Sequence, residues 1–307
     1  MTPLSQRLAQ LSASEMVAAL GVRRAPRLVQ QALALPFYAA SRTLGTTLAA
    51  LDDAIATQGL PEAASQTLQS FGVRLETSGI VARRVGWGPA EFTSAGRGGA
   101  CRPVGQRPQL VLANHPGAYD ALALMSALGR QDLRILAADR TFLRALPRLS
   151  AHLLFVPERP SERAGALKRA VRHLRSGGAL LHFPAGQIEP DADFEPDSAA
   201  LLGLWQPGVA ALVAACARVD GRVLVAGVRG VHSPRAKRWL LNRAAERRGI
   251  TTLSPLLQML GGLRDVTTRV CCHEVARGPA LARLSGPEQQ ALLRAALEGA
   301  IRAAALP

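Results

Sequence analysis

A histidine and an aspartate five positions apart follow a short apolar segment in the first half of the chain. They are His115 and Asp120, in the run NHPGAYD at residues 114–120. A carboxylate that accepts a hydrogen bond from one imidazole nitrogen fixes the tautomer, so the other nitrogen can take a proton from an alcohol or an amine. No serine or cysteine stands beside the pair. The spacing therefore predicts general-base catalysis of a direct transfer, in which the acceptor attacks a thioester. The alternative is a helix start that contains both residues without any chemistry.

The apolar run before His115 predicts how the pair is positioned. Residues 109–113 form a short apolar run typical of a buried strand. The Pro-Gly pair after His115 is expected to open a helix over about 117–128, because proline is tolerated in a first turn. His115 then lies at the carboxyl end of a strand, where open α/β sheets bind their ligands. Asp120 is expected one turn into the helix, where the imidazole can fold back to its carboxylate.

Short apolar runs alternate with helical patterns through the rest of the chain, which indicates an α/β fold. We expect a mixed, largely parallel sheet flanked by helices over residues 76–307, after an N-terminal helical region over 1–75. The expected strands are 109–113, 133–138, 153–156, 179–183, 222–228 and about 266–275. The expected helices are about 117–128, 161–176, 207–218, 234–247 and one from 286. Residues 80–107 are expected to form a loop.

Two more strands are expected to end in residues that suit an anionic group. Residues 180–183 lead into the turn at 184–186, whose backbone N–H groups could face an anion or an oxyanion. Residues 153–156 lead to Arg159, whose guanidinium matches the geometry of a phosphate. Each feature has a plain alternative, namely a turn that merely ends a strand and an arginine that is solvated at the surface.

Together these segments resemble the glycerolipid acyltransferase superfamily, which includes glycerol-3-phosphate and lysophosphatidic acid acyltransferases. The resemblance covers about residues 105–230, with four blocks in the family's order. Two blocks match closely, Asn-His-(four residues)-Asp and Phe-Pro-x-Gly, through Asn114, His115, Asp120, Phe183, Pro184 and Gly186. A third block is similar to Phe155-Val156 with Arg159 displaced by one position. The last block is similar to residues 223–228, with Ala226 at the position of the family's proline.

The resemblance implies an acyltransferase with His115 as general base and Asp120 as its partner. Such an enzyme moves a fatty acyl group from an acyl thioester, either acyl-CoA or acyl-carrier protein, to a hydroxyl or amine of a glycerolipid or lysolipid. No metal and no cofactor beyond this co-substrate are implied. The substrate-binding residues that it implies are Asn114, Gly117, Phe155, Arg159, Phe183, Pro184 and Gly186. The alternative is a non-catalytic lipid-binding protein with a degenerate acyltransferase fold.

Three residues depart from the family's pattern in the Phe-Pro-x-Gly block. Ala185 stands where the family usually has Glu, and Gln187 and Ile188 stand where it usually has Thr and Arg. In the family these positions help to hold the phosphate of the acceptor. The pattern therefore leaves the acceptor open, and a lyso-aminolipid or a glycan-bearing lipid fits as well as a lysophosphatidate.

The composition points to an anionic partner but disfavours nucleic acid. The 307 residues carry a formal net charge of +15 and a pI of about 11.3, which suits lipid headgroups or an acidic acyl donor. Aromatic residues make up only 4% of the chain and do not alternate with the basic residues. The sequence also shows no zinc module and no recognition-helix motif. The four cysteines form no C-x-x-C pair, which predicts neither a zinc site nor a disulfide framework and favours a cytoplasmic setting.

No stretch of about 20 uncharged apolar residues is available for a membrane-spanning helix. No signal peptide is expected either. We therefore expect a protein that lies on the inner face of the cell membrane. Leu44, Leu48 and Leu51 keep helical spacing, and together with Phe37 they could rest against acyl chains, although packing against the α/β domain is an equal alternative.

Overall fold

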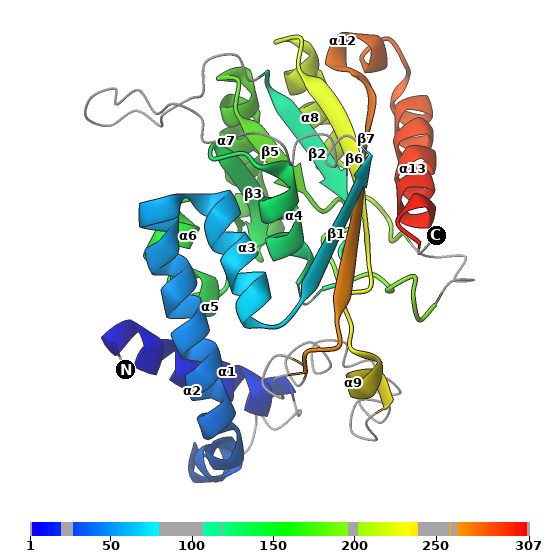
Figure 1. Ribbon diagram of the computed structural model, residues 1–307. Helices are drawn as coiled ribbons and strands as arrows, with labels where there is room; N and C mark the ends of the chain where they lie inside the picture. The colour runs from blue at the N-terminus through cyan, green and yellow to red at the C-terminus, as the bar shows by residue number, and fades with distance from the viewer. Residues whose placement is uncertain are drawn as a thin grey trace.

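A mixed β-sheet forms the centre of the computed structural model. The structure describes residues 2–19, 27–79, 107–117, 119–195, 202–238, 258 and 263–305. In these residues seven strands lie in the order β1-β7-β6-β2-β5-β3-β4 (Figure 1). Their bounds are β1 (Arg74–Gly79), β2 (Gln109–Ala113), β3 (Leu133–Ala138), β4 (Leu153–Val156), β5 (Ala179–His182), β6 (Arg222–Arg229) and β7 (Thr267–Arg277). All neighbours are parallel except β6 and β7, which confirms the predicted largely parallel sheet.

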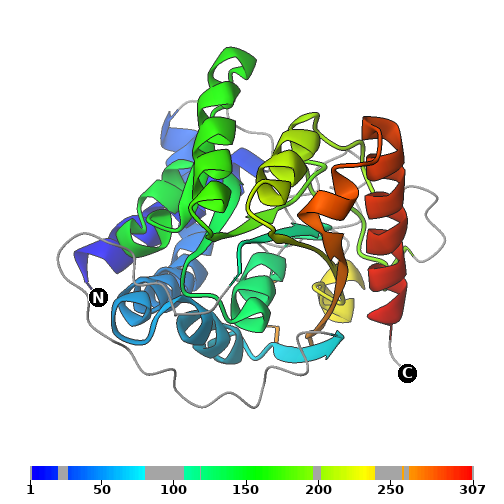
Figure 2. The same ribbon diagram turned by 90° about the horizontal axis from the view of Figure 1, so that it is seen from above.

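Helices cover both faces of the sheet. The described helices are α1 (Pro3–Ala19), α2 (Arg27–Gln58), α3 (Leu60–Ser70), α4 (Asp120–Leu128), α5 (Thr141–Arg144), α6 (Pro147–Ser150), α7 (Arg163–Arg175), α8 (Gly208–Ala217), α9 (Pro234–Arg238), α12 (Gly278–Leu281) and α13 (Gly286–Ala303), with a 3-10 turn at Pro160–Glu162. One hydrophobic core joins α3 and α4 to the sheet, and a second joins α7, α8 and α13 to the opposite face. Figure 2 shows α4 and α8 on opposite sides of the sheet.

The central strand β2 shows why these residues form a buried strand. All five of its residues are buried. Leu110 and Leu112 point into the core with α8, whereas Val111 and Ala113 point into the core with α4. A strand that is covered on both faces needs a continuous apolar run rather than an alternating one. The run therefore fixes β2 in the middle of the sheet, and its carboxyl end delivers His115.

The N-terminal helices pack against the α/β part of the chain. Asp52 on α2 is fully buried, and its Oδ1 accepts hydrogen bonds of 2.9 Å from the backbone N–H groups of Arg148 and Leu149 on α6. Leu44 and Leu51 are 4% and 2% exposed. Of the two alternatives for these leucines, the structure supports packing inside the protein. None of the described helices is long and apolar enough to cross a membrane.

Several expected elements differ from the structure. Strand β1 was not predicted, and it pairs with β7 at the edge of the sheet. The helix expected from about 117 begins at Asp120, and the one expected over 161–176 is divided into the 3-10 turn and α7. The helix expected over 234–247 is described only as α9, and its remainder lies outside the described residues. The loop expected over 80–107 lies outside them as well, apart from residue 107.

Candidate active site

The site lies where the connections of two neighbouring strands leave the sheet in opposite directions. β2 is followed by α4 on one face, and its neighbour β5 is followed by α8 on the other. In open α/β sheets this arrangement leaves a crevice at the carboxyl ends of the two strands, where ligands bind. His115 follows β2 and Phe183 follows β5. Both residues therefore follow the carboxyl ends of neighbouring strands, where such a crevice is expected.

His115 and Asp120 are in direct contact. Nδ1 of His115 lies 2.7 Å from Oδ2 of Asp120, which confirms the contact expected from their spacing. The same carboxylate accepts the backbone N–H of Gly117 at 2.7 Å and that of Ala121 at 2.5 Å. An ionised carboxylate can only accept hydrogen bonds, so Nδ1 carries the proton in the neutral ring and Nε2 keeps its lone pair. Asp120 is 2% exposed in its side chain and His115 30%, so the base has access to a ligand and its partner does not.

The turn between the two residues sets this geometry. Gly117 has a φ of 91°, a conformation that favours glycine and that a helix does not contain. The helix therefore begins at Asp120 instead of about 117, and Asp120 is its first residue rather than a residue one turn inside. This correction has a structural consequence. The Asp120 carboxylate lies at a helix N-terminus, where free backbone N–H groups hold it in place.

The environment of His115 changes its pKa. Burial lowers the pKa, but the charge of Asp120 and its hydrogen bond raise it, and the net result lies above the usual 6.5. His152 and His173 behave differently, because burial lowers the pKa of each and their rings are bonded to backbone carbonyls. Burial also lowers the pKa of His182 to about 4. His115 is thus the one of these four whose protonated form is favoured.

The Phe-Pro-x-Gly block packs directly against His115. The ring of Phe183 stacks on the imidazole of His115, with centroids 4.5 Å apart and an interplanar angle of 29°. A hydrogen bond of 3.1 Å from the N–H of Gly186 to the carbonyl of Phe183 closes the turn, in which Gly186 has a φ of 66°. The carbonyl of Pro184 accepts the N–H of Gln206 at 2.8 Å. The block therefore orients the imidazole ring by direct contact.

Asn114 ties the site to strand β6. Its side chain accepts the N–H of Val228 at 2.7 Å and donates to the carbonyl of Val228 at 2.8 Å. The residue is 1% exposed. It therefore joins the end of β2 to the end of β6 and holds the backbone next to His115.

A buried carboxylate that the sequence did not single out completes the site. Glu189 accepts the backbone N–H of His115 at 2.9 Å and that of Gly203 at 2.6 Å. Its own N–H donates to the carbonyl of His115 at 2.8 Å. The only signal in the sequence is an acidic residue shortly after the Phe-Pro-x-Gly block.

Comparison with known proteins assigns the family of this region. Residues 97–223 match the family model described as Acyltransferase, and they include the His115–Asp120 pair and the Phe-Pro-x-Gly block. The chain contains an acyltransferase domain. The family and the class of enzyme expected from the sequence are thereby confirmed. None of the curated proteins compared with the chain matches it.

A solved structure similar to this chain is the crystal structure of the 1-acyl-sn-glycerophosphate (LPA) acyltransferase, PlsC, from Thermotoga maritima. The two are 14% identical, the match covers 81% of this chain and 80% of that chain, and the TM-score is 0.44. The acceptor of this acyltransferase domain therefore has to be argued from its own residues.

Two of the predicted site residues lie away from the His115–Asp120 pair. Phe155 belongs to edge strand β4, three places from β2 in the sheet, which corresponds to about 14 Å. The guanidinium of Arg144 lies 4.4 Å from the centre of its ring. The side chain of Arg159 is 81% exposed and lies 3.5 Å from Glu162. The structure therefore places these residues at the rim of the acyltransferase domain.

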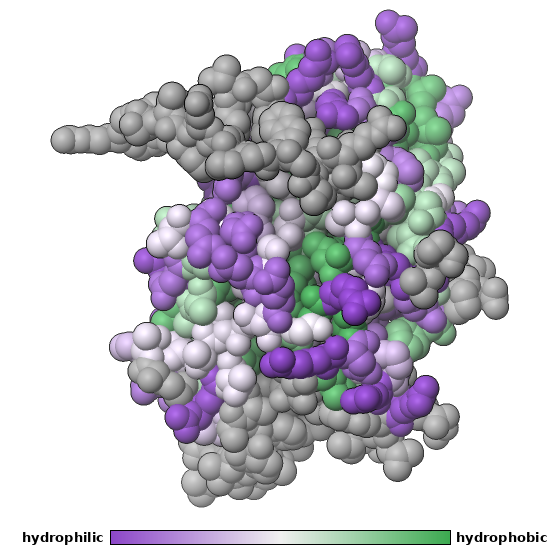
Figure 3. Space-filling view, in the orientation of Figure 1, coloured by the Kyte–Doolittle hydropathy of each residue, from purple (hydrophilic) through white to green (hydrophobic). Residues whose placement is uncertain are grey.

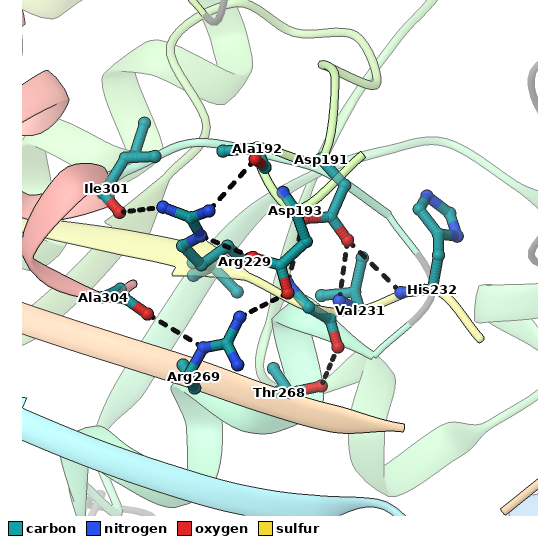
Figure 4. Close-up of polar contacts among 12 residues, drawn as sticks. Asp191, Ala192, Asp193, Arg229, Val231, His232, Thr268, Arg269, Ile301 and Ala304 are labelled. Carbon is teal, nitrogen blue, oxygen red and sulfur yellow. Dashed lines mark hydrogen bonds and ion pairs between the residues drawn. The ribbon is translucent and has the colours of Figure 1, made fainter. Parts of the chain in front are cut away.

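A second polar cluster lies at the end of β6 (Figure 4). Arg229 donates from Nε to Oδ1 of Asp193 at 2.6 Å, and Arg269 donates to the other oxygen of the same carboxylate. The two guanidinium groups also donate to the carbonyls of Ile301 and Ala304 near the end of α13, at 3.4 and 2.9 Å. A cavity of about 380 Å³ adjoins the cluster and is lined by Asp193, Phe194, Arg229, Pro234 and Arg269.

The described cysteines and metal-binding side chains offer no alternative chemistry to His115. Cys216, Cys271 and Cys272 are buried, and burial raises the pKa of Cys216 to about 11. Cys101 lies outside the described residues. Within the described part of the chain, no group of three His, Cys, Asp or Glu side chains could hold a metal ion.

Proposed function

We propose that this acyltransferase moves a fatty acyl group from an acyl thioester to a hydroxyl or amine of a glycerolipid or lysolipid, with His115 as the general base. The observation that carries the proposal is the 2.7 Å contact between Nδ1 of His115 and Asp120. It commits Nδ1 to the carboxylate and leaves Nε2 as the basic nitrogen. Among the described residues, no hydrogen-bond partner occupies Nε2.

The reaction follows from the position of that nitrogen. Nε2 of His115 takes the proton of the acceptor as its oxygen or nitrogen attacks the acyl carbonyl. The tetrahedral intermediate then expels the thiolate, so a C–O or C–N bond forms and the C–S bond breaks. The imidazolium returns its proton to the leaving thiolate. Asp120 keeps the ring in the correct tautomer and stabilises its positive charge. These steps need no cofactor besides the donor, acyl-CoA or acyl-carrier protein.

The remaining predicted residues serve binding in this proposal. Phe183 stacks on the imidazole ring, and Gly117 and Gly186, both with positive φ, shape the turns after β2 and β5. Arg159, with its exposed guanidinium, is available for an anionic group at the rim. Figure 3 shows an apolar strip near the centre of the face on which Figure 1 draws α4, bordered by hydrophilic side chains. Such a surface suits an acyl chain and is consistent with action at a membrane surface.

Substitution of His115 by alanine tests the proposal. Purified protein would be incubated with a long-chain acyl-CoA or acyl-carrier protein and a panel of lysolipids, and both free thiol and acylated lipid would be measured. We expect H115A to lose about 10²- to 10⁴-fold in kcat, the usual contribution of a general base. His273→Ala, at an exposed histidine on β7, is the matched control and should keep its activity.

The competing function is lipid binding without catalysis, which the alanine at position 185 motivates. Release of thiol by the wild type in the presence of an acceptor speaks against it. A wild type that binds lysolipid but releases no thiol with any donor supports it. Full transfer by a well-folded H115A would overturn the proposed role of His115.

A further inference from the structure

The backbone of His115 is held on both sides by a single glutamate. Oε2 of Glu189 accepts the N–H of His115 at 2.9 Å, and the N–H of Glu189 donates to the carbonyl of His115 at 2.8 Å. The two residues therefore exchange a pair of hydrogen bonds although they lie 74 positions apart. Glu189 is only 4% exposed. A buried carboxylate with this arrangement fixes the peptide groups on both sides of the catalytic side chain.

We propose that Glu189 is a positioning residue for His115, which holds the backbone of the base against the segment 202–206 and places a second negative charge beside its ring. The proposal rests on the proposed role of His115 as the general base. Glu189 itself touches neither the thioester nor the acceptor. It acts through the orientation and the charge state of His115.

The second oxygen of Glu189 joins the base to another part of the chain. Oε1 accepts the N–H of Gly203 at 2.6 Å. Arg294 on α13 donates to the carbonyls of Gly203 and Leu202, at 2.7 and 3.2 Å. The N–H of Gln206 donates to the carbonyl of Pro184 in the Phe-Pro-x-Gly turn. The segment 202–206 is thus fixed at three points, and Glu189 is the point that connects it to His115.

Ala185 belongs to the same arrangement. It is 4% exposed, and a Cβ built on Gly203 would lie 3.0 Å from its own Cβ. A longer side chain at position 185 would therefore displace the segment 202–206. Four residues later, Glu189 places a carboxylate beside the same segment and accepts the N–H of Gly203 at 2.6 Å. The small side chain at 185 thus leaves room for the segment 202–206, and the carboxylate at 189 binds that segment.

The charges around the imidazole give the proposal a measurable sign. Asp120 on α4 and Glu189 face His115, and Arg294 on α13 faces Glu189. The negative charge of Glu189 helps to raise the pKa of His115. Burial raises the pKa of Glu189, and its two backbone hydrogen bonds lower it. The base must be neutral to act, so activity rises with pH through the pKa of His115. Removal of the charge at 189 lowers that pKa and moves the rise in activity to lower pH.

Glu189→Gln is the decisive variant, because it removes the charge at nearly constant volume. The NH₂ group of the amide would also face one of the two backbone N–H groups that donate to the carboxylate, so that one of the two hydrogen bonds is lost. We expect kcat to fall by about tenfold, since small displacements of a catalytic group cost this much or more. We also expect the acidic limb of the kcat/KM profile and the NMR titration of the His115 ring to move to lower pH. Glu62→Gln, at an exposed glutamate on α3, is the matched control and should change neither.

A second variant separates charge from reach. Glu189→Asp keeps the charge but is one methylene shorter, so it cannot reach both His115 and Gly203. We expect its acidic limb to stay close to that of the wild type while kcat still falls severalfold. If E189Q does not fold, this variant decides, and a folded E189D with wild-type kcat overturns the proposal.

The NMR titration distinguishes the two proposals from each other. A folded E189Q with an unchanged His115 titration and unchanged kcat overturns the positioning role and leaves the general base intact. Full activity of H115A overturns the general base, whereas the titration of His115 in E189Q still tests whether Glu189 acts on the ring. Loss of thermal stability in E189Q without a shift in the titration shows a purely structural residue and also overturns the proposal.

Discussion

Two polar clusters lie at the same edge of the sheet, but their carboxylates have different partners. In the first, Asp120 and Glu189 surround His115, whose Nε2 keeps its lone pair. In the second, Asp193 is shared by Arg229 and Arg269, and both guanidinium groups donate further to backbone carbonyls near the end of α13. The segment after β5 supplies acids to both clusters, four residues apart.

The difference lies in which group is left with unused bonding capacity. The carboxylates around His115 are occupied by N–H donors, and the group that remains available is a basic nitrogen on a side chain that is 30% exposed. In the second cluster the arginines are 14% and 9% exposed in their side chains and already paired with a carboxylate. We infer that the first cluster prepares a proton acceptor, whereas the second fastens α13 to the sheet. The two clusters should therefore respond differently to the same chemical change.

The largest effect is expected for Asp120→Asn. The amide can donate to Nδ1 and so favours the tautomer with the proton on Nε2, which removes the base. We expect kcat to fall by about 10²- to 10⁴-fold, as in other His-carboxylate pairs. Steady-state assays of thiol release with a saturating acceptor measure this loss. The result would contradict the comparison if D120N kept more than a tenth of the activity while its thermal unfolding matched that of the wild type.

The sequence predicted the parts of the site that are local along the chain. The bounds of β2, β3 and β4 agree with the expected strands to the residue, because each is a short, largely apolar run bounded by turns. The contact between His115 and Asp120 was predictable because only four residues separate them along the chain. The start of α4 was wrong by about three residues, since the sequence does not reveal which way Gly117 turns.

The parts that the sequence did not predict depend on distant partners. Strand β1 has no buried residue, and its pairing with β7 joins segments about 190 residues apart, so no local apolar pattern indicates it. Glu189 escaped notice for a related reason. Its partners are the backbone groups of His115 and Gly203, and residue types do not encode backbone partners. The family motif marked Ala185 as the loss of a glutamate. The structure shows that Glu189, four residues later, places a carboxylate next to His115 and Gly203.

A smaller effect, on stability rather than activity, is expected for Asp193→Asn. The amide oxygen can accept from only one guanidinium and its NH₂ group faces the other, so one guanidinium loses its carboxylate and keeps only its backbone carbonyls. We expect the free energy of unfolding to fall by about 1–3 kcal/mol, with kcat per folded molecule close to that of the wild type. Urea unfolding followed by circular dichroism measures the first, and the thiol assay measures the second.

Asp139→Asn is the matched control for this change. Asp139 pairs with Arg144 at 2.5 and 2.8 Å, but the guanidinium is 56% exposed. Exposed ion pairs contribute little to stability, so this variant should unfold much closer to the wild type than D193N does. A D193N protein that is as stable as D139N but has lost transfer would reverse the assignment of the two clusters, because it would place Asp193 in the catalytic machinery.

The smallest effect is expected for Arg159→Ala, and it bears on which acceptor the rim can hold. Unlike Arg229 and Arg269, Arg159 has its guanidinium in solvent, 3.5 Å from a single glutamate. A solvated charge adds only modestly to binding, so we expect KM for a phosphate-bearing lysolipid to rise by about two- to fivefold with kcat unchanged. KM for an acceptor without a phosphate should not change. Arg283→Ala, an exposed arginine after α12, removes the same charge far from the rim and should alter neither KM. Equal KM values for R159A and R283A with every anionic acceptor would show that Arg159 does not bind the acceptor. The neutral part of the lipid would then determine which acceptor is used.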